Sequence, residues 1–417
     1  MPNLLGNAPA IAGVGPTTVP IAPPAIAPVS VPGTVHRYRL RDLDADLARL
    51  ADARISIYRS LAECEVVWRR AVAAGACFAF QCFEWQAAFQ ATIGAAEGVE
   101  PYIVDIADRN GRSLLLLPLC LERQGRLRAI AFLGGAVTDY GAPVIDPEFA
   151  ASVLPGEIER LLATVLNLLP PADFVWLRRM PQAIENVRNP LAELPQARHT
   201  ENGHALSLPD TADGFRVSPN NRRKRRQLAK LGAVEFRSPP PDSPEAAAIL
   251  PVLAAQKSRR WIETVNWDMF AKPGYRAFYD VLSGAALQSG EVHVSALTVG
   301  GTIVAAHWGI VFRGRYYFLL VGRQDGEWGR YSPGRLLIED LIGWCLARGG
   351  VGVFDLTAGE EGYKREWTDH SLPLFEYLAP RSAAGMLFIA QYRARQWLKQ
   401  NRRLRNSVRR LKGKHAK

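Results

Sequence analysis

The chain has few cysteines and no long hydrophobic run, and both deficits exclude broad classes of protein. Its five cysteines among 417 residues form no CxxC pair and show no Cys/His spacing typical of a metal site. We therefore predict reduced core cysteines in a cytoplasmic protein without a metal. The longest apolar run after the first 34 residues, Ala71 to Phe80, contains a glycine. It is far shorter than the roughly 18 residues of a membrane-spanning helix, which excludes a transmembrane protein.

The N-terminal end of the chain lacks charged side chains, and the C-terminal end lacks acidic ones. Residues 1–34 hold no charged side chain, and prolines interrupt their apolar stretches. This composition predicts a disordered leader rather than a signal peptide. From Tyr392 to Lys417 there are eleven Lys and Arg and no Asp or Glu, which equals the whole net charge of +11. The rest of the chain is therefore neutral.

The common nucleotide and hydrolase motifs are also missing. Neither GxGxxG nor GxxxxGK[ST] occurs, which disfavours dinucleotide and ATP binding. No GxSxG elbow occurs, and nothing marks a cysteine as a nucleophile. A covalent enzyme intermediate is therefore not expected.

Two stretches of the chain share one order of predicted elements, which is three strands, a glycine-bearing loop, a helix and a strand. Hairpin turns are expected at Asn110-Gly111 and Gly300-Gly301. The first set of strands is predicted at 102–106, 113–120, 127–133 and 174–177, and the second at 292–299, 303–312, 316–321 and 351–356. The repeated order predicts a mixed-sheet α/β fold that arose by duplication.

The same pattern predicts four segments. A leader covers 1–34, a first α/β domain 35–205, a second 206–384, and a basic helical tail 385–417. Trp397, Leu404, Val408 and Leu411 fall on one stripe of that tail with arginines around them. A basic amphipathic helix can lie on an anionic membrane surface, dock on an acidic partner or touch nucleic acid.

The most informative segment is the predicted helix start at Ser332-Pro333-Gly334-Arg335. Ser332 suits the N-cap and Pro333 the first helical position. Arg335 in the first turn and Arg330 just before it oppose the helix dipole, at about 0.3–1 kcal/mol. An anion on the free amides would explain them, with Tyr331 beside it. The alternative is an ordinary capped helix in which Arg335 pairs with Glu339.

Residues 215–370 resemble the GNAT-type acyltransferase domain of cellulose-biosynthesis acetyltransferases of the CelD/BcsL kind, which are related in fold to the FemABX aminoacyltransferases. The likeness extends over roughly 78–378. It rests on these segments: Asn221 to Arg226, Lys257 to Trp261, Val304 to His307, Ser332-Pro333-Gly334, Asp355-Leu356, Tyr363-Lys364 with Trp367, Phe83 to Trp85, and Thr138 to Gly141.

The resemblance implies tandem GNAT-like domains and acetyl-CoA or another acyl-CoA as donor. It implies an N- or O-acyltransferase that acts on a small or sugar-linked acceptor in polysaccharide or cellulose biosynthesis. The chain departs from the Q/R-x-x-G-x-G/A loop of typical GNAT proteins, because the loop from Gly322 to Gly334 is longer and lacks that spacing. A Fem-like transferase that uses aminoacyl-tRNA therefore stays open, as does a noncatalytic scaffold at the membrane surface; nucleic acid is the less favoured partner.

A direct attack on the donor thioester needs a base, a polarising group and an acid. Candidates for the base are Asp355 at the end of a predicted strand, Glu327 and Asp325 in the loop after another strand, and His307 within a strand. A histidine in that position is often a core residue instead.

Further candidates lie in two loops. Tyr363 is predicted to protonate the leaving thiolate, and Lys364 to polarise a carbonyl or bind an acidic acceptor. Trp367 is expected at the substrate, together with Asp139 and Tyr140 from the equivalent loop of the first half. Simple solvation, or turn chemistry in the case of Asp139, is the alternative for the loop residues.

Overall fold

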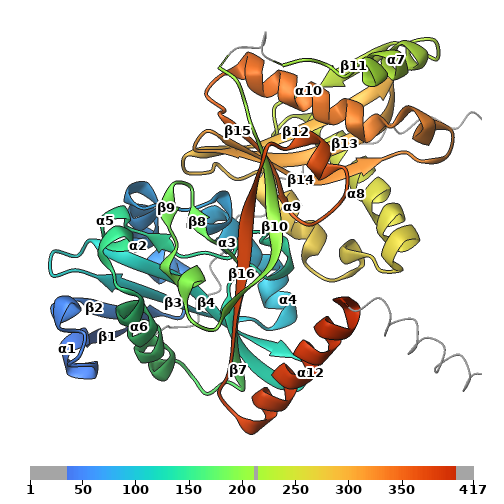
Figure 1. Ribbon diagram of the computed structural model, residues 1–417. Helices are drawn as coiled ribbons and strands as arrows, with labels where there is room; N and C mark the ends of the chain where they lie inside the picture. The colour runs from blue at the N-terminus through green and yellow to red at the C-terminus, as the bar shows by residue number, and fades with distance from the viewer. Residues whose placement is uncertain (1–34, 211–214, 401–417) are drawn as a thin grey trace, which may run out of the picture.

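The computed structural model describes residues 35–210 and 215–400 (Figure 1). The predicted leader at 1–34 lies outside the described residues. The same holds for Leu404, Val408 and Leu411 of the predicted tail stripe.

The N-terminal half contains a meander of strands flanked by helices. Its strands are β1 (His36–Arg39), β2 (Arg54–Tyr58), β3 (Glu100–Ala107), β4 (Ser113–Gln124), β5 (Leu127–Phe132), β6 (Val144–Ile145) and β7 (Phe174–Pro181), followed by the small hairpin β8 (Ala183–Ile184) and β9 (Val187–Arg188). Its helices are α1 (Leu40–Leu43), α2 (Leu61–Ala74), α3 (Phe83–Phe89), α4 (Ala95–Glu97), α5 (Pro147–Ser152) and α6 (Pro155–Leu168).

The C-terminal half repeats the arrangement. The strand between the halves is β10 (Ala197–Ser207), which ends the first half in sequence. The strands of the second half are β11 (Val234–Arg237), β12 (Gly290–Val299), β13 (Thr302–Phe312), β14 (Arg315–Arg323), β15 (Val353–Ala358) and β16 (His370–Pro380). Its helices are α7 (Pro219–Leu228), α8 (Pro244–Val265), α9 (Tyr275–Ser283), α10 (Pro333–Arg348), α11 (Lys364–Trp367) and α12 (Ala383–Gln400). Every strand predicted in the two repeats is confirmed, with ends shifted by a few residues.

The two halves exchange their last strands. The sheet runs β1-β2-β3-β4-β5-β7-β16-β10-β15-β14-β13-β12-β11. Thus β10, which follows the first half in sequence, pairs with β15, while β16, which follows the second half, pairs with β7. These exchanged strands also pair with each other and form the ribbon between the two halves (Figure 1). The predicted domain boundary at residue 205 falls inside β10.

Each half contains one parallel strand pair that separates after a short paired stretch. β5 pairs with β7 over Ala129–Ala131, and β14 pairs with β15 over Arg315–Tyr317. Beyond these points the partners diverge, and backbone groups there lack that strand partner. Arg179 in β7 and Thr357 in β15 both have a positive φ just beyond the paired stretch. This shared irregularity supports the interpretation of a duplication.

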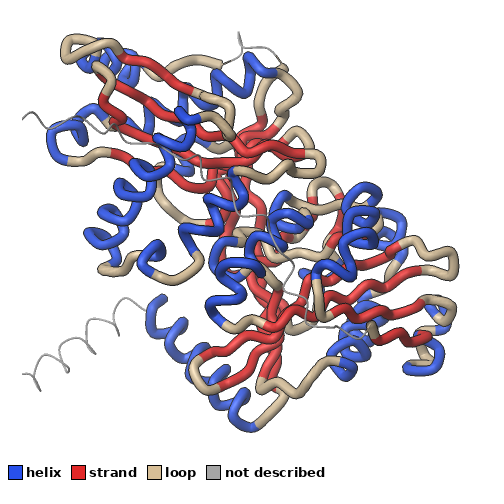
Figure 2. Tube along the Cα trace, turned by 180° about the vertical axis from the view of Figure 1, so that it is seen from behind, coloured by secondary structure: helices blue, strands red, loops and turns tan. Residues whose placement is uncertain are grey.

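Helices cover both faces of the C-terminal strands. On β13, Trp308 belongs to the same apolar cluster as Leu253 of α8, whereas Val311 belongs to the cluster of Leu341 on α10. Because side chains alternate along a strand, α8 and α10 lie on opposite faces. Seen from behind, helices likewise surround the strands of both halves (Figure 2).

One apolar core runs through both halves. Trp85 of α3 packs with its ring centroid 5.0 Å from Phe278 of α9 and 6.3 Å from Trp308. Phe80 lies 5.5 Å from Tyr317. The halves are therefore joined by packed aromatic side chains as well as by strands.

A buried polar contact crosses the same junction. The carboxylate of Asp355, which is fully buried, accepts hydrogen bonds from the Tyr140 hydroxyl at 2.8 Å and the Arg315 guanidinium at 2.9 Å. The backbone amide of Thr357 donates a third at 2.7 Å. Burial raises the pKa of Asp355, while Arg315 acts in the opposite direction. Tyr140 of the first half thus helps to hold an acidic group of the second.

Replacing Tyr140 by Phe removes one donor to this buried carboxylate. An under-bonded buried acceptor costs about 1–3 kcal/mol, so we expect the free energy of unfolding in urea to fall by about that amount. Tyr38→Phe in the edge strand β1 is the matched control. An unchanged unfolding midpoint for Tyr140→Phe would show that the contact contributes nothing.

Candidate active site

The predicted helix start is confirmed, because α10 begins at Pro333 directly after Ser332. The Ser332 hydroxyl does not cap the helix, and Ser332 has a positive φ of 52°. Instead the Lys224 ammonium of α7 donates to this hydroxyl at 2.7 Å. The alternative of an ordinary capped helix is wrong in both parts, since Arg335 pairs with Glu366 at 2.6 Å and not with Glu339.

Positive charge gathers around this helix start. Lys224 is half-buried, and its pKa is lowered by that burial and by the charges of Arg335 and Arg223. Arg323 at the end of β14 has its Cδ 3.6 Å from where a Cβ at Gly334 would stand. Pro333 and Gly334 are themselves buried, so an anion reaching the helix amides meets these cationic side chains first.

Helix α11 brings further candidates to the same place. The Arg335 guanidinium lies 5.9 Å from the ring centroid of Trp367. The indole N–H of Trp367 is buried and has no acceptor among the described residues. Burial raises the pKa of Tyr363, and the charge of Arg323 opposes that shift. A buried donor without a partner is costly, so Trp367 fits a site that a ligand completes.

A cluster of charged side chains from both halves borders α11. The buried Lys364 ammonium donates to the Ala358 carbonyl at 2.6 Å and pairs with Glu361 at 3.0 Å. Lys257 of α8 lies with its ammonium 5.0 Å from the Trp261 ring centroid. Burial lowers the pKa of Lys257 to about 8, helped by Lys364 and opposed by Glu361 and by Asp139 of the first half. The sequence analysis did not select Lys257, and its only signal was membership of the resembling Lys257–Trp261 segment.

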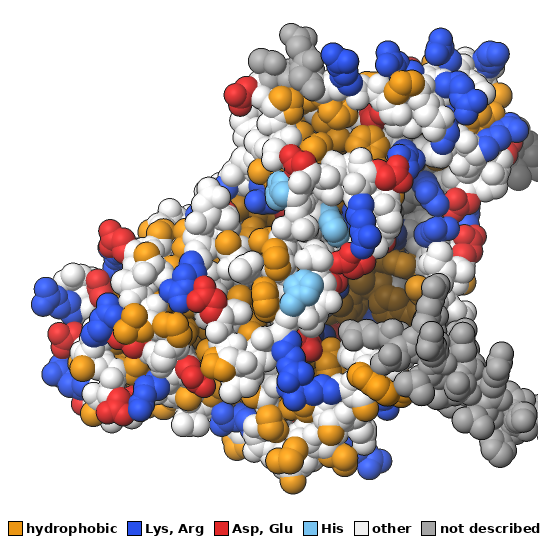
Figure 3. Space-filling model, in the orientation of Figure 1, with side chains coloured by type: hydrophobic (Ala, Val, Ile, Leu, Met, Phe, Trp, Pro, Cys, Tyr) orange, Lys and Arg blue, Asp and Glu red, His pale blue; other side chains and the backbone are white. Residues whose placement is uncertain are grey.

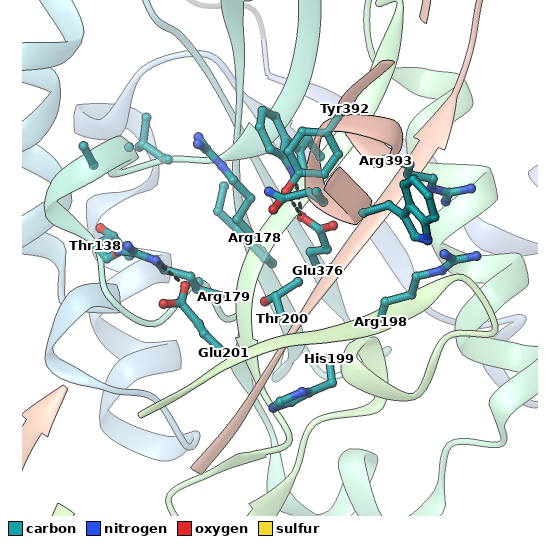
Figure 4. A pocket seen from close by; sticks show the side chains of 18 residues that line it. Thr138, Arg178, Arg179, Arg198, His199, Thr200, Glu201, Glu376, Tyr392 and Arg393 are labelled. Atoms are coloured by element: carbon teal, nitrogen blue, oxygen red, sulfur yellow. Dashed lines mark hydrogen bonds and ion pairs between the residues drawn. The ribbon is translucent and has the colours of Figure 1, made fainter. Parts of the chain in front are cut away.

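From the first half, the charge of Asp139 acts on Lys257 of this cluster. The Arg179 guanidinium pairs with Asp139 at 2.9 Å and with Glu201 of β10 at 3.1 Å. Arg179 and Glu201 in turn line a cavity of about 660 Å³ beneath α12. Figure 4 shows this cavity, and Figure 3 shows the surface hollowed beside the exchanged strands, with charged side chains gathered at its rim.

Several predicted residues are not brought to this place. Asp355 and Tyr140 are buried and bond to each other. His307 is fully buried, stacks 4.5 Å from the Phe318 ring centroid, and has its pKa lowered well below the usual value by burial. Glu327 is exposed on the 3₁₀-helix Gly326–Tyr331.

The remaining predicted loop residues lie on the same approach to α10. Arg330 is exposed, with its guanidinium 4.8 Å from the ring centroid of the buried Tyr331. Asp325 pairs with Arg323 at 3.4 Å. The structure thus brings together Arg335, Trp367, Tyr363, Lys364 and the Ser332–Gly334 turn.

Comparison with known families matches residues 216–365 to the acetyltransferase (GNAT) domain. The match runs from just before α7 into α11 and includes the start of α10. The C-terminal half therefore carries a GNAT acetyltransferase domain. No curated protein matches this chain.

Solved structures align with about three quarters of this chain at low identity. FemX aligns with a TM-score of 0.50 at 10% identity, over 75% of this chain and 95% of that chain. A conserved protein of unknown function from Bacteroides thetaiotaomicron VPI-5482 gives 0.47 at 12%, over 77% and 97%. A tandem GNAT protein from the clavulanic acid biosynthesis pathway gives 0.43 at 13%, over 77% and 94%.

Together with the family match and the repeated topology, the likeness to FemX confirms the predicted fold class. The chain is a mixed α/β protein of tandem GNAT-like halves, and its domain match and fold support an acyltransferase.

The lowered pKa of Lys257 predicts a pH dependence of stability. From about pH 8 to pH 10.5 the folded protein binds fewer protons at this site than the unfolded chain. The free energy of unfolding therefore gains a contribution that grows with pH across that window. We expect the increase to be smaller in Lys257→Met than in the wild type in urea titrations at several pH values. Lys272→Met at an exposed position is the control, and identical pH slopes in wild type and Lys257→Met would refute the assignment.

Proposed function

We propose that the chain is an acyl-CoA-dependent N- or O-acyltransferase that acts on a polysaccharide or cell-envelope precursor, as the resemblance to CelD/BcsL-type proteins implies. The observation that carries the proposal is the start of α10, where Lys224, Arg323 and Arg335 converge on a buried turn. Arg335 and Arg323 also pair with Glu366 and Asp325, and Lys224 adds a third cation at the Ser332 hydroxyl. A helix N-terminus with these cations around it favours an anionic ligand. The diphosphate of an acyl-CoA has that chemistry.

The donor's thioester arm fits the space between β14 and β15. Strand pairing there ends at Tyr317 and Asp355, and an extended chain with amide groups can bond to the free strand edges. Tyr363 lies close enough to Arg323 for its charge to act on the hydroxyl, and Trp367 lies beside Arg335. Both aromatic residues therefore lie near the proposed path of the thioester arm. The residues present therefore fit acetyl-CoA or a longer acyl-CoA.

In the proposed reaction an amine or hydroxyl of the acceptor attacks the thioester carbonyl carbon. The new C–N or C–O bond forms, the C–S bond breaks, and the thiolate takes a proton. Tyr363 supplies that proton. Lys257 takes the acceptor's proton, because its pKa of about 8 leaves a fraction neutral near neutral pH. We assign Asp355 and His307 to positioning, because both are buried among protein partners, and Lys364 to ordering the loop that it binds.

We further propose that the protein works in the cytoplasm, with α12 and the basic tail attaching it to the inner membrane face. No described helix is long and apolar enough to cross a membrane. Support comes from the exposed apolar side chains Met386, Leu387, Trp397 and Leu398 on α12. Apolar side chains next to arginines are typical of helices that lie on anionic lipid.

A Fem-like, aminoacyl-tRNA-dependent reaction is the second candidate. The observation that favours it is α7, which carries five basic residues from Arg222 to Arg226 beside the start of α10. Such a helix can contact the phosphates of tRNA as well as those of CoA. A noncatalytic scaffold remains the third interpretation.

Titration of acetyl-CoA by calorimetry tests donor binding. We expect Lys224→Ala and Gly334→Trp each to weaken binding about tenfold or more, because one removes a charge-assisted contact and the other fills the turn. Lys230→Ala, exposed just beyond α7, is the control. Binding of charged tRNA without affinity for CoA would move the assignment to the Fem-like reaction. If neither donor binds and removal of residues 392–417 releases the protein from vesicles, the scaffold interpretation is correct.

Removing the proposed acid is a separate test. Tyr363→Phe is expected to lower kcat about 100-fold, within the usual contribution of general acid catalysis. The KM for acyl-CoA should stay close to that of the wild type, because the ring is kept. A variant with wild-type kcat would exclude Tyr363 from proton transfer.

A further inference from the structure

The cavity beneath α12 carries more positive than negative charge. It is lined by the end of β5, by β7, by both exchanged strands and by α12. Its walls hold four arginines against two glutamates: Arg178, Arg179, Arg198, Arg393, Glu201 and Glu376. At about 660 Å³ it has the size of a small-molecule site rather than that of a single-ion site.

Both glutamates are already occupied. Glu201 pairs with Arg179. Glu376 accepts hydrogen bonds from the indole N–H of Trp176 at 3.1 Å and from the Tyr392 hydroxyl at 3.0 Å. Arg178 also has a partner, since it pairs with Glu122 at 3.2 Å.

The other two arginines have no such partner. Arg198 of β10 stands directly across from Glu376 of β16 in the sheet register, yet the two form no ion pair. Arg393 lines the same cavity from α12. Within the described residues neither guanidinium has an acidic partner, and both reach the same side of the cavity in Figure 4. Both side chains are exposed and line the same cavity, so an anion that enters it can contact both guanidinium groups.

Another part of the lining is aromatic and apolar. The Arg178 guanidinium lies 4.6 Å from the Trp176 ring centroid, and the Tyr392 ring lies 5.2 Å from that of Trp176. The hydrogen bonds to Glu376 fix both rings. Phe132 and Leu133 from the end of β5 complete this part of the lining. A ligand with one anionic end and one flat or apolar part fits both parts of the lining.

We propose that this cavity binds the acceptor, which carries a phosphate or carboxylate group held by Arg198 and Arg393 and rests its apolar part on Trp176 and Tyr392. The inference rests on the proposed acyltransferase function and adds the substrate class. Arg179 connects the cavity to Asp139, whose charge acts on Lys257 beside the proposed donor path. Helix α12 thereby becomes part of the substrate site.

The test is calorimetric titration with uridine diphosphate, inorganic phosphate, and vesicles of phosphatidylcholine containing phosphatidylglycerol. All titrations use the full chain with Lys224→Ala, so that the proposed donor cradle does not contribute. We expect a soluble phosphate to bind, and Arg198→Gln with Arg393→Gln to weaken its binding at least tenfold. Arg198→Lys should restore part of the affinity, and Arg395→Gln, exposed on α12 outside the cavity lining, should leave it unchanged.

Every outcome of these titrations either supports or overturns the proposed acceptor site. Loss of soluble-phosphate binding in the double variant supports a soluble acceptor. Vesicle binding that depends on the same two arginines, without binding of soluble phosphates, supports a lipid-linked acceptor. Binding that is absent for all three probes, or that is equal in the Lys224→Ala chain with and without the two arginine substitutions, overturns the site. Since acetyl-CoA binding is measured separately in the chain with Lys224 intact, failure here is distinguishable from failure of the proposed function.

Discussion

The exchange of β10 and β16 is the constraint on which the rest of the structure depends. Each half contributes the strand that completes the sheet of the other, and the two strands also bond to each other. Neither half can therefore rotate away without breaking a ladder of backbone hydrogen bonds, each of which is costly to leave unmade. Charged groups from the two halves, such as Asp139 and Lys257, are held in a fixed relation because the ribbon between them is shared.

The exchange of strands also determines the surroundings of the buried carboxylate of Asp355. A carboxylate at the end of a strand in an open α/β sheet commonly faces a ligand. Here Asp355 lies within β15, opposite Ala205 of the exchanged strand β10, and it accepts hydrogen bonds from Tyr140 and Arg315. A buried charge is tolerated where such partners satisfy it, and removing one partner is destabilising. The predicted position of Asp355 in the sheet therefore suggested a catalytic residue, whereas its burial between paired strands favours a structural role.

Local signals carried most of what the sequence could predict. The Asn110-Gly111 and Gly300-Gly301 turns and the Ser332-Pro333 helix start depend on neighbouring residues, and the structure places all three as expected. The sequence analysis missed α2, β1, β2 and β16. The proline at 373 interrupts the pattern of β16, whose place depends on β7 and β10. Tyr140, one of the hydrogen-bond partners of Asp355, lies 215 residues away in the sequence. No local pattern could therefore reveal the burial of Asp355, or the cavity beneath α12.

The two halves repeat one fold, but different helices lie beside the parallel strand pair of each half. This difference is what the proposed binding of a donor and an acceptor depends on. Both halves open a parallel strand pair, β5 with β7 and β14 with β15. In the second half the opening lies beside α10 and α11, whose residues supply cations and a buried indole donor. In the first half α12 packs through Phe388 and Ile389 against Ala129 and Phe174 of the paired stretch, and a cavity lined by arginines lies beyond that stretch. On the proposed function, the donor would bind beside α10 in the second half and the acceptor in the cavity of the first, and Asp139 and Lys257, whose charges interact, would link the two sites.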